Sequence, residues 1–260
     1  MTELKRDIAC SYELAASGFS RHADNHIYRH LAGPLVQFLG PIQGVVLDVA
    51  SGSGAVARLL PQVVALDISR NLLKANDALL RVQADAEQLP FRDDSFAAGT
   101  CAFGLNHFPR PAIALAELAR VAPLVGVVTW KRPEKPYVPA EAIFGVIERH
   151  CGRARSPVGE AVERMSVEVG SEPALAALLA DVGLAATVST VGTTVPWPGT
   201  EAFVDYRLSM LGSLANETDM PKLRADAIAA VDGLDSDRLA WEPDLVMAVG
   251  RRPAVRRSVL

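Results

Sequence analysis

The segment VVLDVASGSGAVARLL, residues 45–60, joins an apolar run that ends in an acid to a turn with two glycines. Gly52, Gly54 and Ala57 have the spacing G-x-G-x-x-A, which lets the backbone approach a ligand closely because glycine has no Cβ. Asp67 ends the next apolar run, where a carboxylate accepts hydrogen bonds from both hydroxyls of a ribose. This spacing predicts a site for a ligand that contains a nucleoside.

Asp48 distinguishes between two kinds of such ligand. A pyrophosphate favours neutral N–H groups at a helix N-terminus, so a carboxylate just before the turn opposes it. A ligand with an ammonium group gains from the same carboxylate, directly or through water. Ribose with an amino acid and no phosphate indicates S-adenosylmethionine. An NAD(P)-dependent oxidoreductase would use the same turn and remains an alternative, although the sequence has no Tyr-x-x-x-Lys pair.

Apolar runs and helical stripes alternate along the chain, which predicts a parallel sheet covered on both faces. Three segments fit this sheet poorly, and insertions in such folds gather over the carboxyl ends of the strands. We therefore expect one domain, with a core at about 40–132, 171–198 and 240–252 and a cap from about 1–39, 133–170 and 199–239. The predicted strands are 45–49, 63–66, 81–84, 96–103, 125–130, 185–197 and 245–249, and the predicted core helices are 55–60, 69–80, 111–121 and 172–182.

Four motifs occur in a fixed order: VVLDVASGSG, VVALDIS, ADAEQLPFRDDSF and CAFGLNHFPRPAIALAELARV. They resemble the successive motifs of class I S-adenosylmethionine-dependent methyltransferases, of the branch that includes the ubiquinone and menaquinone biosynthesis methyltransferases. With the alternation, the resemblance implies an α/β fold: a Rossmann-like, seven-stranded, mostly parallel sheet with helices on both faces and a mainly helical cap. It covers about 45–130, a third of the chain.

The resemblance implies a set of cofactor contacts. The turn passes beneath the methionine part of the cofactor, Asp67 holds the ribose, and Asp85 and Ala86 bind the adenine. Three departures from the family pattern are Ala50 in place of a glycine, Ala97 in place of an acid, and APLVG before the fifth strand. The implied contact residues are Asp48, Ala50, Ser51, Gly52, Gly54, Asp67, Ile68, Leu72, Asp85, Ala86, Ala102 and Phe103.

His107 follows the fourth strand, beside the expected position of the sulfonium. An imidazole there could remove a proton from the acceptor, and it is our candidate catalytic residue. Alternatively, His107 only lines the pocket. Tyr12 and Phe19 close over the cofactor or pack within the first helix, and Tyr206, Met210 and Trp197 line an acceptor pocket or belong to the core.

The composition limits the partners. The net charge of −4 and the lack of an NPPY-like motif after the fourth strand argue against nucleic acid, so we expect a small-molecule methyl acceptor. His22, His26 and His30 recur every four residues, but no cluster completes a metal site, and we expect no metal. No apolar run is long enough for a membrane span. The odd, widely spaced cysteines indicate a reducing cytoplasm.

The predicted function is transfer of a methyl group, by in-line displacement, from S-adenosylmethionine to a small, partly hydrophobic organic molecule. Apolar residues of the cap, among them Phe144 and Phe203, favour such an acceptor. The sequence leaves open whether oxygen, carbon or nitrogen is methylated and whether the protein forms a homodimer. A non-catalytic protein that binds S-adenosylmethionine or S-adenosylhomocysteine is a second alternative.

Overall fold

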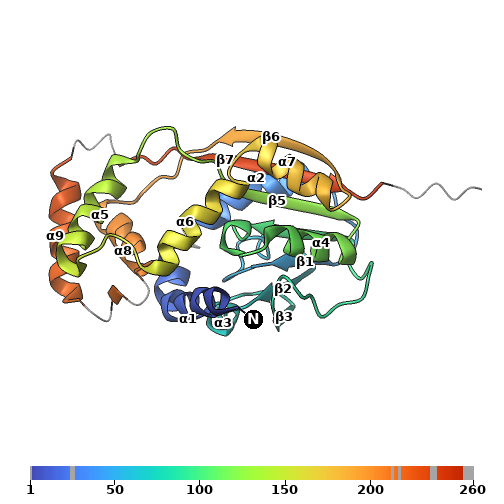
Figure 1. The fold of residues 1–260 in the computed structure, drawn as a ribbon, viewed down its shortest axis with the longest axis horizontal. Helices are drawn as coiled ribbons and strands as arrows, with labels where there is room; N and C mark the ends of the chain where they lie inside the picture. Colours follow the sequence, from blue (N-terminus) through green and yellow to red (C-terminus); the bar gives the residue numbers. More distant parts are fainter. Residues whose placement is uncertain (1, 24–26, 212–213, 216–217, 235–238, 254–260) are drawn as a thin grey trace, which may run out of the picture.

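The computed structural model describes residues 2–23, 27–211, 214–215, 218–234 and 239–253. Seven strands form one sheet in the order β3-β2-β1-β4-β5-β7-β6 (Figure 1). The first five strands are parallel, whereas β7 is antiparallel to both of its neighbours. This confirms the predicted α/β fold. The strands are β1 (Val46–Val49), β2 (Val63–Asp67), β3 (Leu80–Gln83), β4 (Ala98–Ala102), β5 (Leu124–Trp130), β6 (Ala185–Gly192) and β7 (Asp244–Arg251).

Helices cover both faces of the sheet, because β1, β2, β4 and β5 are buried on both sides. One face packs on α4 (Pro111–Val121) and α7 (Glu172–Asp181). The other packs on α2 (Arg29–Leu39), the short α3 (Arg70–Lys74) and part of α1 (Glu3–Ala23). Gly126 lets α2 approach closely, since a Cβ there would lie 2.8 Å from a methyl carbon of Leu39. Helix α2, expected in the cap, therefore covers the sheet instead.

A third hydrophobic cluster holds a helical lobe together at the left of Figure 1. The lobe consists of α5 (Val138–Cys151), α8 (Thr200–Ser209) and α9 (Met220–Asp232), which come from two of the segments expected to form a cap. Helix α6 (Pro157–Val169) contacts α1 and a 3-10 turn, η2 (Leu105–His107). The lobe thus reaches the carboxyl ends of the strands through α1 and α6.

The helix predicted at 55–60 is wrong, because these residues form a series of turns. One bond runs from the Arg58 N–H to the Gly54 carbonyl, but the Leu59 N–H bonds the nearer carbonyl of Val56. Only six residues separate Gly54 from Pro61, and the residue before a proline avoids the helical region. The segment is therefore too short to propagate a helix.

The helix predicted at 69–80 is also shorter than expected. Ser69 caps α3 through a hydrogen bond from the Leu72 N–H to its hydroxyl, and the helix ends at Lys74. The side chain of Asn76 then bonds the Gly52 carbonyl and the Ser51 hydroxyl, which turns the chain back toward the glycine turn. The last residue of the predicted stripe, Leu80, starts the edge strand β3 and is 58% exposed.

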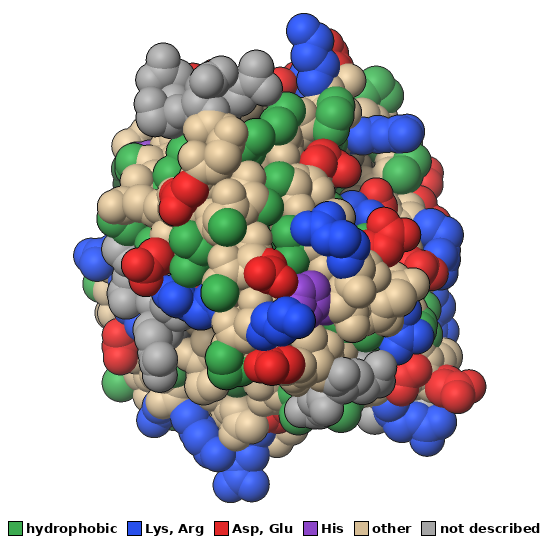
Figure 2. All heavy atoms as spheres, turned by 90° about the vertical axis from the view of Figure 1, so that its left-hand side faces the viewer, with side chains coloured by type: hydrophobic (Ala, Val, Ile, Leu, Met, Phe, Trp, Pro, Cys, Tyr) green, Lys and Arg blue, Asp and Glu red, His purple; other side chains and the backbone are tan. Residues whose placement is uncertain are grey.

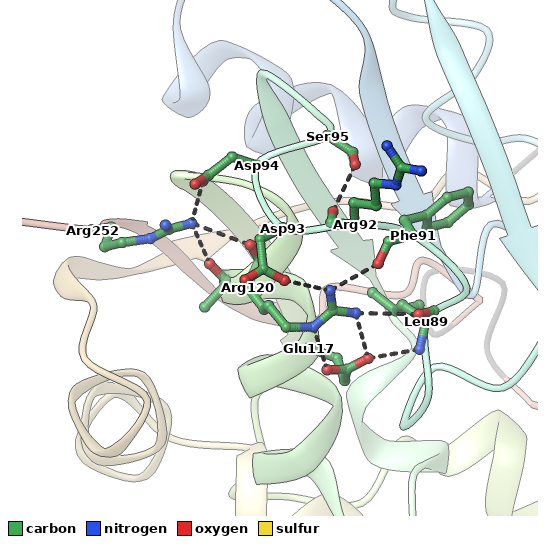
Figure 3. Close-up of polar contacts among 10 residues, drawn as sticks. Leu89, Phe91, Arg92, Asp93, Asp94, Ser95, Glu117, Arg120 and Arg252 are labelled. Carbon is green, nitrogen blue, oxygen red and sulfur yellow. Dashed lines mark hydrogen bonds and ion pairs between the residues drawn. The ribbon is translucent and has the colours of Figure 1, made fainter.

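The loop between β3 and β4 is fastened to α4 by one arginine (Figure 3). The Arg120 guanidinium donates to the carbonyls of Leu89 and Phe91 and pairs with Asp93 and Glu117. These charged hydrogen bonds raise the pKa of Arg120 further above its ordinary value. The loop that follows Asp85 is thereby held against the sheet.

Candidate active site

A cavity of about 920 Å³, including its open mouth, lies at the carboxyl ends of β1, β2 and β4. This is where open α/β sheets bind ligands. Its wall includes the glycine turn, the ends of these strands and one face of α1. Of the predicted site residues, those that line it are Ala50, Ser51, Gly52, Asp67, Ile68, Leu72, Asp85, Ala86, Ala102, Phe103 and His107.

The floor of the cavity has a backbone conformation that L-residues rarely adopt. Ala50 and Phe103 have φ values of 54° and 59°, and Gly52 has a φ of 52°. A Cβ on Gly104 would lie 2.6 Å from the Cβ of Ala50, so only glycine fits beside Ala50. Positive φ at residues other than glycine costs free energy and concentrates at functional sites. The turn thus keeps its shape although Ala50 replaces the glycine of the family pattern.

Asp67 fastens the turn and faces the cavity. Its two carboxylate oxygens accept hydrogen bonds from the Gly52 and Ser69 N–H groups, each at 2.8 Å. Burial raises the pKa of Asp67 to about 6, although these hydrogen bonds oppose the shift. The group is therefore largely ionised at pH 7. Its remaining lone pairs are available to accept from hydroxyl groups of a ligand.

Asp48 and Gly54, two of the predicted contact residues, do not line the cavity. Asp48 lies opposite Thr100 on the neighbouring strand and accepts a hydrogen bond from its hydroxyl at 2.8 Å. Gly54, with a φ of 103°, leaves room for the Asn76 side chain, whose oxygen would lie 3.0 Å from a Cβ. Asp48 thus bonds the neighbouring strand and Gly54 lies against Asn76, so neither residue faces the cavity.

Lys5 closes the far end of the cavity, and the sequence motifs did not reveal it. Its ammonium group lies 2.8 Å from a carboxylate oxygen of Asp85 and 2.8 Å from one of Glu87. Arg110 pairs with Glu87 from the other side. Lys5 reaches these acids from α1, eighty positions away in the sequence, so no local pattern could have indicated the contact. Helix α1 is thus attached to the segment expected to bind adenine.

Tyr12 and His107 form a pair between this cavity and a second one. The Tyr12 hydroxyl lies 3.1 Å from each imidazole nitrogen, and the rings meet edge to face. Burial lowers the pKa of His107 to about 4 and raises the pKa of Tyr12 above its ordinary value. At neutral pH, the imidazole is neutral and shares a hydrogen bond with the Tyr12 hydroxyl. Both residues line both cavities.

The second cavity encloses about 940 Å³, including its mouth, between α1, α5, α6 and α8. Tyr206 and Met210 line it, whereas Trp197 stacks on Tyr206 from outside the described lining. Phe19 lines the first cavity, which agrees with the expectation that it closes over the cofactor. Tyr28, which the motifs also did not indicate, lines the first cavity beside Phe103.

Metal ligands do not gather among the residues that the structure describes. The side chains of His22 and His26, two members of the predicted histidine stripe, lie outside these residues. In the same part of the chain, no helix is long and apolar enough to cross a membrane.

Residues 47–128 match the model of a family described as a methyltransferase domain. The chain is 40% identical over 93 residues to the ubiquinone/menaquinone biosynthesis C-methyltransferase UbiE of Rhizobium rhizogenes, covering 29% of this chain and 36% of that protein. It is 33% identical over 147 residues to the demethylmenaquinone methyltransferase of Porphyromonas gingivalis, covering 48% of this chain and 58% of the relative. The matches thus span less than two thirds of these curated relatives.

The likeness in fold extends over most of the chain. The crystal structure of an S-adenosylmethionine-dependent methyltransferase from Thermotoga maritima superimposes with a TM-score of 0.53 and 13% identity, covering 94% of this chain and 99% of that one. The protein therefore has the fold of the class I methyltransferases. Within that class, the resemblance to the branch of the ubiquinone and menaquinone biosynthesis methyltransferases is confirmed over the motif region.

Proposed function

We propose that this protein transfers a methyl group from S-adenosylmethionine to a small, partly hydrophobic organic acceptor. The observation that carries the proposal is the arrangement of two adjoining cavities with the Tyr12–His107 pair between them. The first contains the glycine turn and Asp67, and the second is bounded by helices of the lobe. A cofactor and an acceptor can therefore meet at one shared wall. The relatives named as methyltransferases support this proposal.

The residues of the first cavity fit the cofactor in their chemistry. Asp67 would hold the ribose hydroxyls, Asp85 would accept from the adenine amine, and Ile68 and Leu72 would pack against the adenine. Gly52 leaves the turn without a side chain where the methionine part would lie. When bound, the cofactor supplies an activated methyl group and its leaving group, so the protein mainly has to align the acceptor.

His107 and Tyr12 would act on the acceptor side. The pKa of about 4 keeps His107 neutral from pH 5 upward, so one of its two ring nitrogens has a lone pair that can accept a proton or a hydrogen bond. Helices α1 and α6 cover this region and exclude water, which leaves the acceptor poorly solvated. A reaction that needs a strong base would not suit so weakly basic an imidazole. We infer that His107 orients an acceptor group and takes its proton as the methyl group arrives.

The test is isothermal titration of the purified protein with S-adenosylmethionine, S-adenosylhomocysteine and NADH. We expect the first two to bind and NADH not to bind. Transfer of labelled methyl to a panel of oxygen, carbon and nitrogen nucleophiles then identifies the acceptor atom. Binding without transfer to any member would support a non-catalytic binding protein, and binding of NADH alone would indicate an oxidoreductase. The cytoplasmic location also stays a prediction.

A further inference from the structure

The second cavity carries a charge pattern that the methyl-transfer proposal does not explain. Arg155 and Arg207 both line it, and no Asp or Glu does so among the described residues. Both guanidinium groups stack on the ring of Phe144, with their central carbons 4.1 Å and 4.9 Å from its centroid. Two cations thus share one aromatic ring on the wall of a cavity that lacks acidic residues of its own.

Arg207 has no carboxylate within ion-pair distance in the described part of the chain. Burial lowers the pKa of Arg207, and the nearby positive charge of Arg155 acts in the same direction. Arg155 is partly neutralised by Glu163, 3.2 Å away, but that side chain is 62% exposed and does not line the cavity. Arg207 is partly buried, and a charge held away from water without a partner is costly. The carboxylate of a ligand would compensate this charge.

Helix α6 adds to the same field. Its first turn, with Val158 and Gly159, borders the cavity, and Ser156 caps it by accepting from the Gly159 N–H. The N-terminus of a helix carries a partial positive charge. The positive end of α6 and two guanidinium groups therefore face one space.

Most of the remaining lining is apolar. Ile147, Val162, Leu211 and Leu214 are among the residues that line the cavity. Tyr12 and His107 also line it and border the cofactor cavity as well. The cavity thus offers two positive charges, an apolar body and the residues expected to act in methyl transfer.

We propose that this cavity binds an acceptor with a carboxylate on a hydrophobic skeleton, and that Arg207 and Arg155 hold the carboxylate. The proposal rests on the proposed function, because it names the class of acceptor for the same reaction. Guanidinium groups bind carboxylates through paired N–H donors, which gives geometry as well as charge. The group that receives the methyl would then lie toward His107.

The test compares carboxylic acids with their methyl esters, which share the skeleton but lack the charge. Benzoate, phenylacetate, cinnamate and indole-3-acetate are titrated by calorimetry into the protein, with and without S-adenosylhomocysteine. We expect at least one acid to bind at least tenfold more tightly than its ester. Equal affinity for every acid and its ester, or no binding of any acid, would overturn the proposal.

Arg207→Met and Arg155→Met should each abolish the preference for the acid while the affinity for S-adenosylhomocysteine stays unchanged. Arg164→Met is the matched control, because this substitution removes the same charge from an exposed residue of α6 that does not line the cavity. Arg207→Lys should retain part of the preference for the acid. It replaces Arg207→Met in the test if the methionine variant does not fold. An unchanged preference in the folded variants would contradict the assignment. Failure of S-adenosylmethionine to bind would contradict the proposed function, whereas acid binding is measured independently of it.

Discussion

Asp67 has two tasks, because the carboxylate that faces the cavity also accepts the N–H groups that shape the turn. We expect Asp67→Ala to weaken binding of S-adenosylmethionine by about 2–4 kcal/mol, since charged hydrogen bonds to the ribose are lost. Calorimetry measures the change. Asp77→Ala is the control, because Asp77 is exposed and its carboxylate forms a surface ion pair with Arg58. A folded Asp67→Ala protein with unchanged affinity would remove Asp67 from the site.

Asp48 is buried, and one of its oxygens has no hydrogen-bond partner among the described atoms. Burial raises its pKa to about 7, above the ordinary 3.8. The folded state therefore holds a proton that the unfolded state has released between about pH 4 and 7. Stability from this group is present below pH 4 and is lost as the pH rises to 7.

Replacement of Asp48 by Asn removes this titration. We compare the free energy of unfolding of Asp48→Asn with that of the parent protein at each pH. We expect the difference between variant and parent to be about 1–3 kcal/mol more favourable to the variant at pH 8 than at pH 5. Chemical denaturation at the two pH values measures it. A difference between the two proteins that does not change with pH would show that Asp48 is already ionised when the protein folds at pH 5.

At the scale of elements, two helical glycines are expected to respond oppositely to the same substitution. A Cβ on Gly145 in α5 would have as its nearest neighbour the flexible end of the Arg149 side chain, 3.7 Å away, so Gly145→Ala should stabilise the protein by about 0.5–1 kcal/mol through helix propensity. A Cβ on Gly18 in α1 would lie 2.8 Å from the Cβ of Ser209 on α8. Gly18→Ala should therefore be neutral or destabilising, and thermal unfolding of both variants measures the contrast. A gain at Gly18 equal to that at Gly145 would mean that α1 and α8 separate easily.

Elements with strong local signals were predicted well. Helix α4 occupies the predicted residues 111–121, because Pro111 suits the first turn and the apolar stripe follows. The buried β-branched strands were also found within one or two residues of their expected positions. The helix at 55–60 was predicted wrongly because Pro61 ends the segment, and the helix at 69–80 because Asn76 within it bonds the distant Gly52 instead of continuing the helix.

The site could be predicted only where it follows from consecutive residues. The glycine turn and Asp67 lie in one strand-turn-strand segment, and the cavity lies where that segment predicts. Lys5 and Arg207 come from helices that are remote in the sequence and meet the site only through tertiary packing. A lone lysine or arginine on a helix is usually a solvated charge, so no signal in the sequence marked these two.

At the scale of the whole molecule, α1 links the sheet to the lobe. It contacts α3, α6 and α8, and its Lys5 joins Asp85 and Glu87. We expect Lys5→Met to cost about 2–4 kcal/mol, because two carboxylates lose a buried cation. Hydrogen exchange should accelerate along α1, and S-adenosylmethionine should bind more weakly. Arg6→Met is the control, because Arg6 is exposed on the same helix. Unchanged exchange in α1 would show that its apolar contacts hold it without the ion pairs.

The surface of the lobe agrees with a small-molecule acceptor. Figure 2 shows the end of the molecule formed by the lobe, where acidic and basic side chains are interspersed among apolar ones. No broad basic area is visible on this face. The net charge of −4 points the same way. The concentrated positive charge lies instead inside the second cavity.

The aromatic residues connect the two cavities. Trp130 lies 4.6 Å, ring centre to ring centre, from Phe103 at the first cavity and 5.0 Å from Trp241. The rings of Tyr137 and Phe203 link Trp241 to Trp197. Trp197 in turn lies 5.3 Å from Tyr206 at the second cavity. All three tryptophans of the chain therefore belong to one series of contacting aromatic rings. Intrinsic fluorescence should report occupancy of either cavity without a label, and the order in which two ligands enter can be followed by light emission alone.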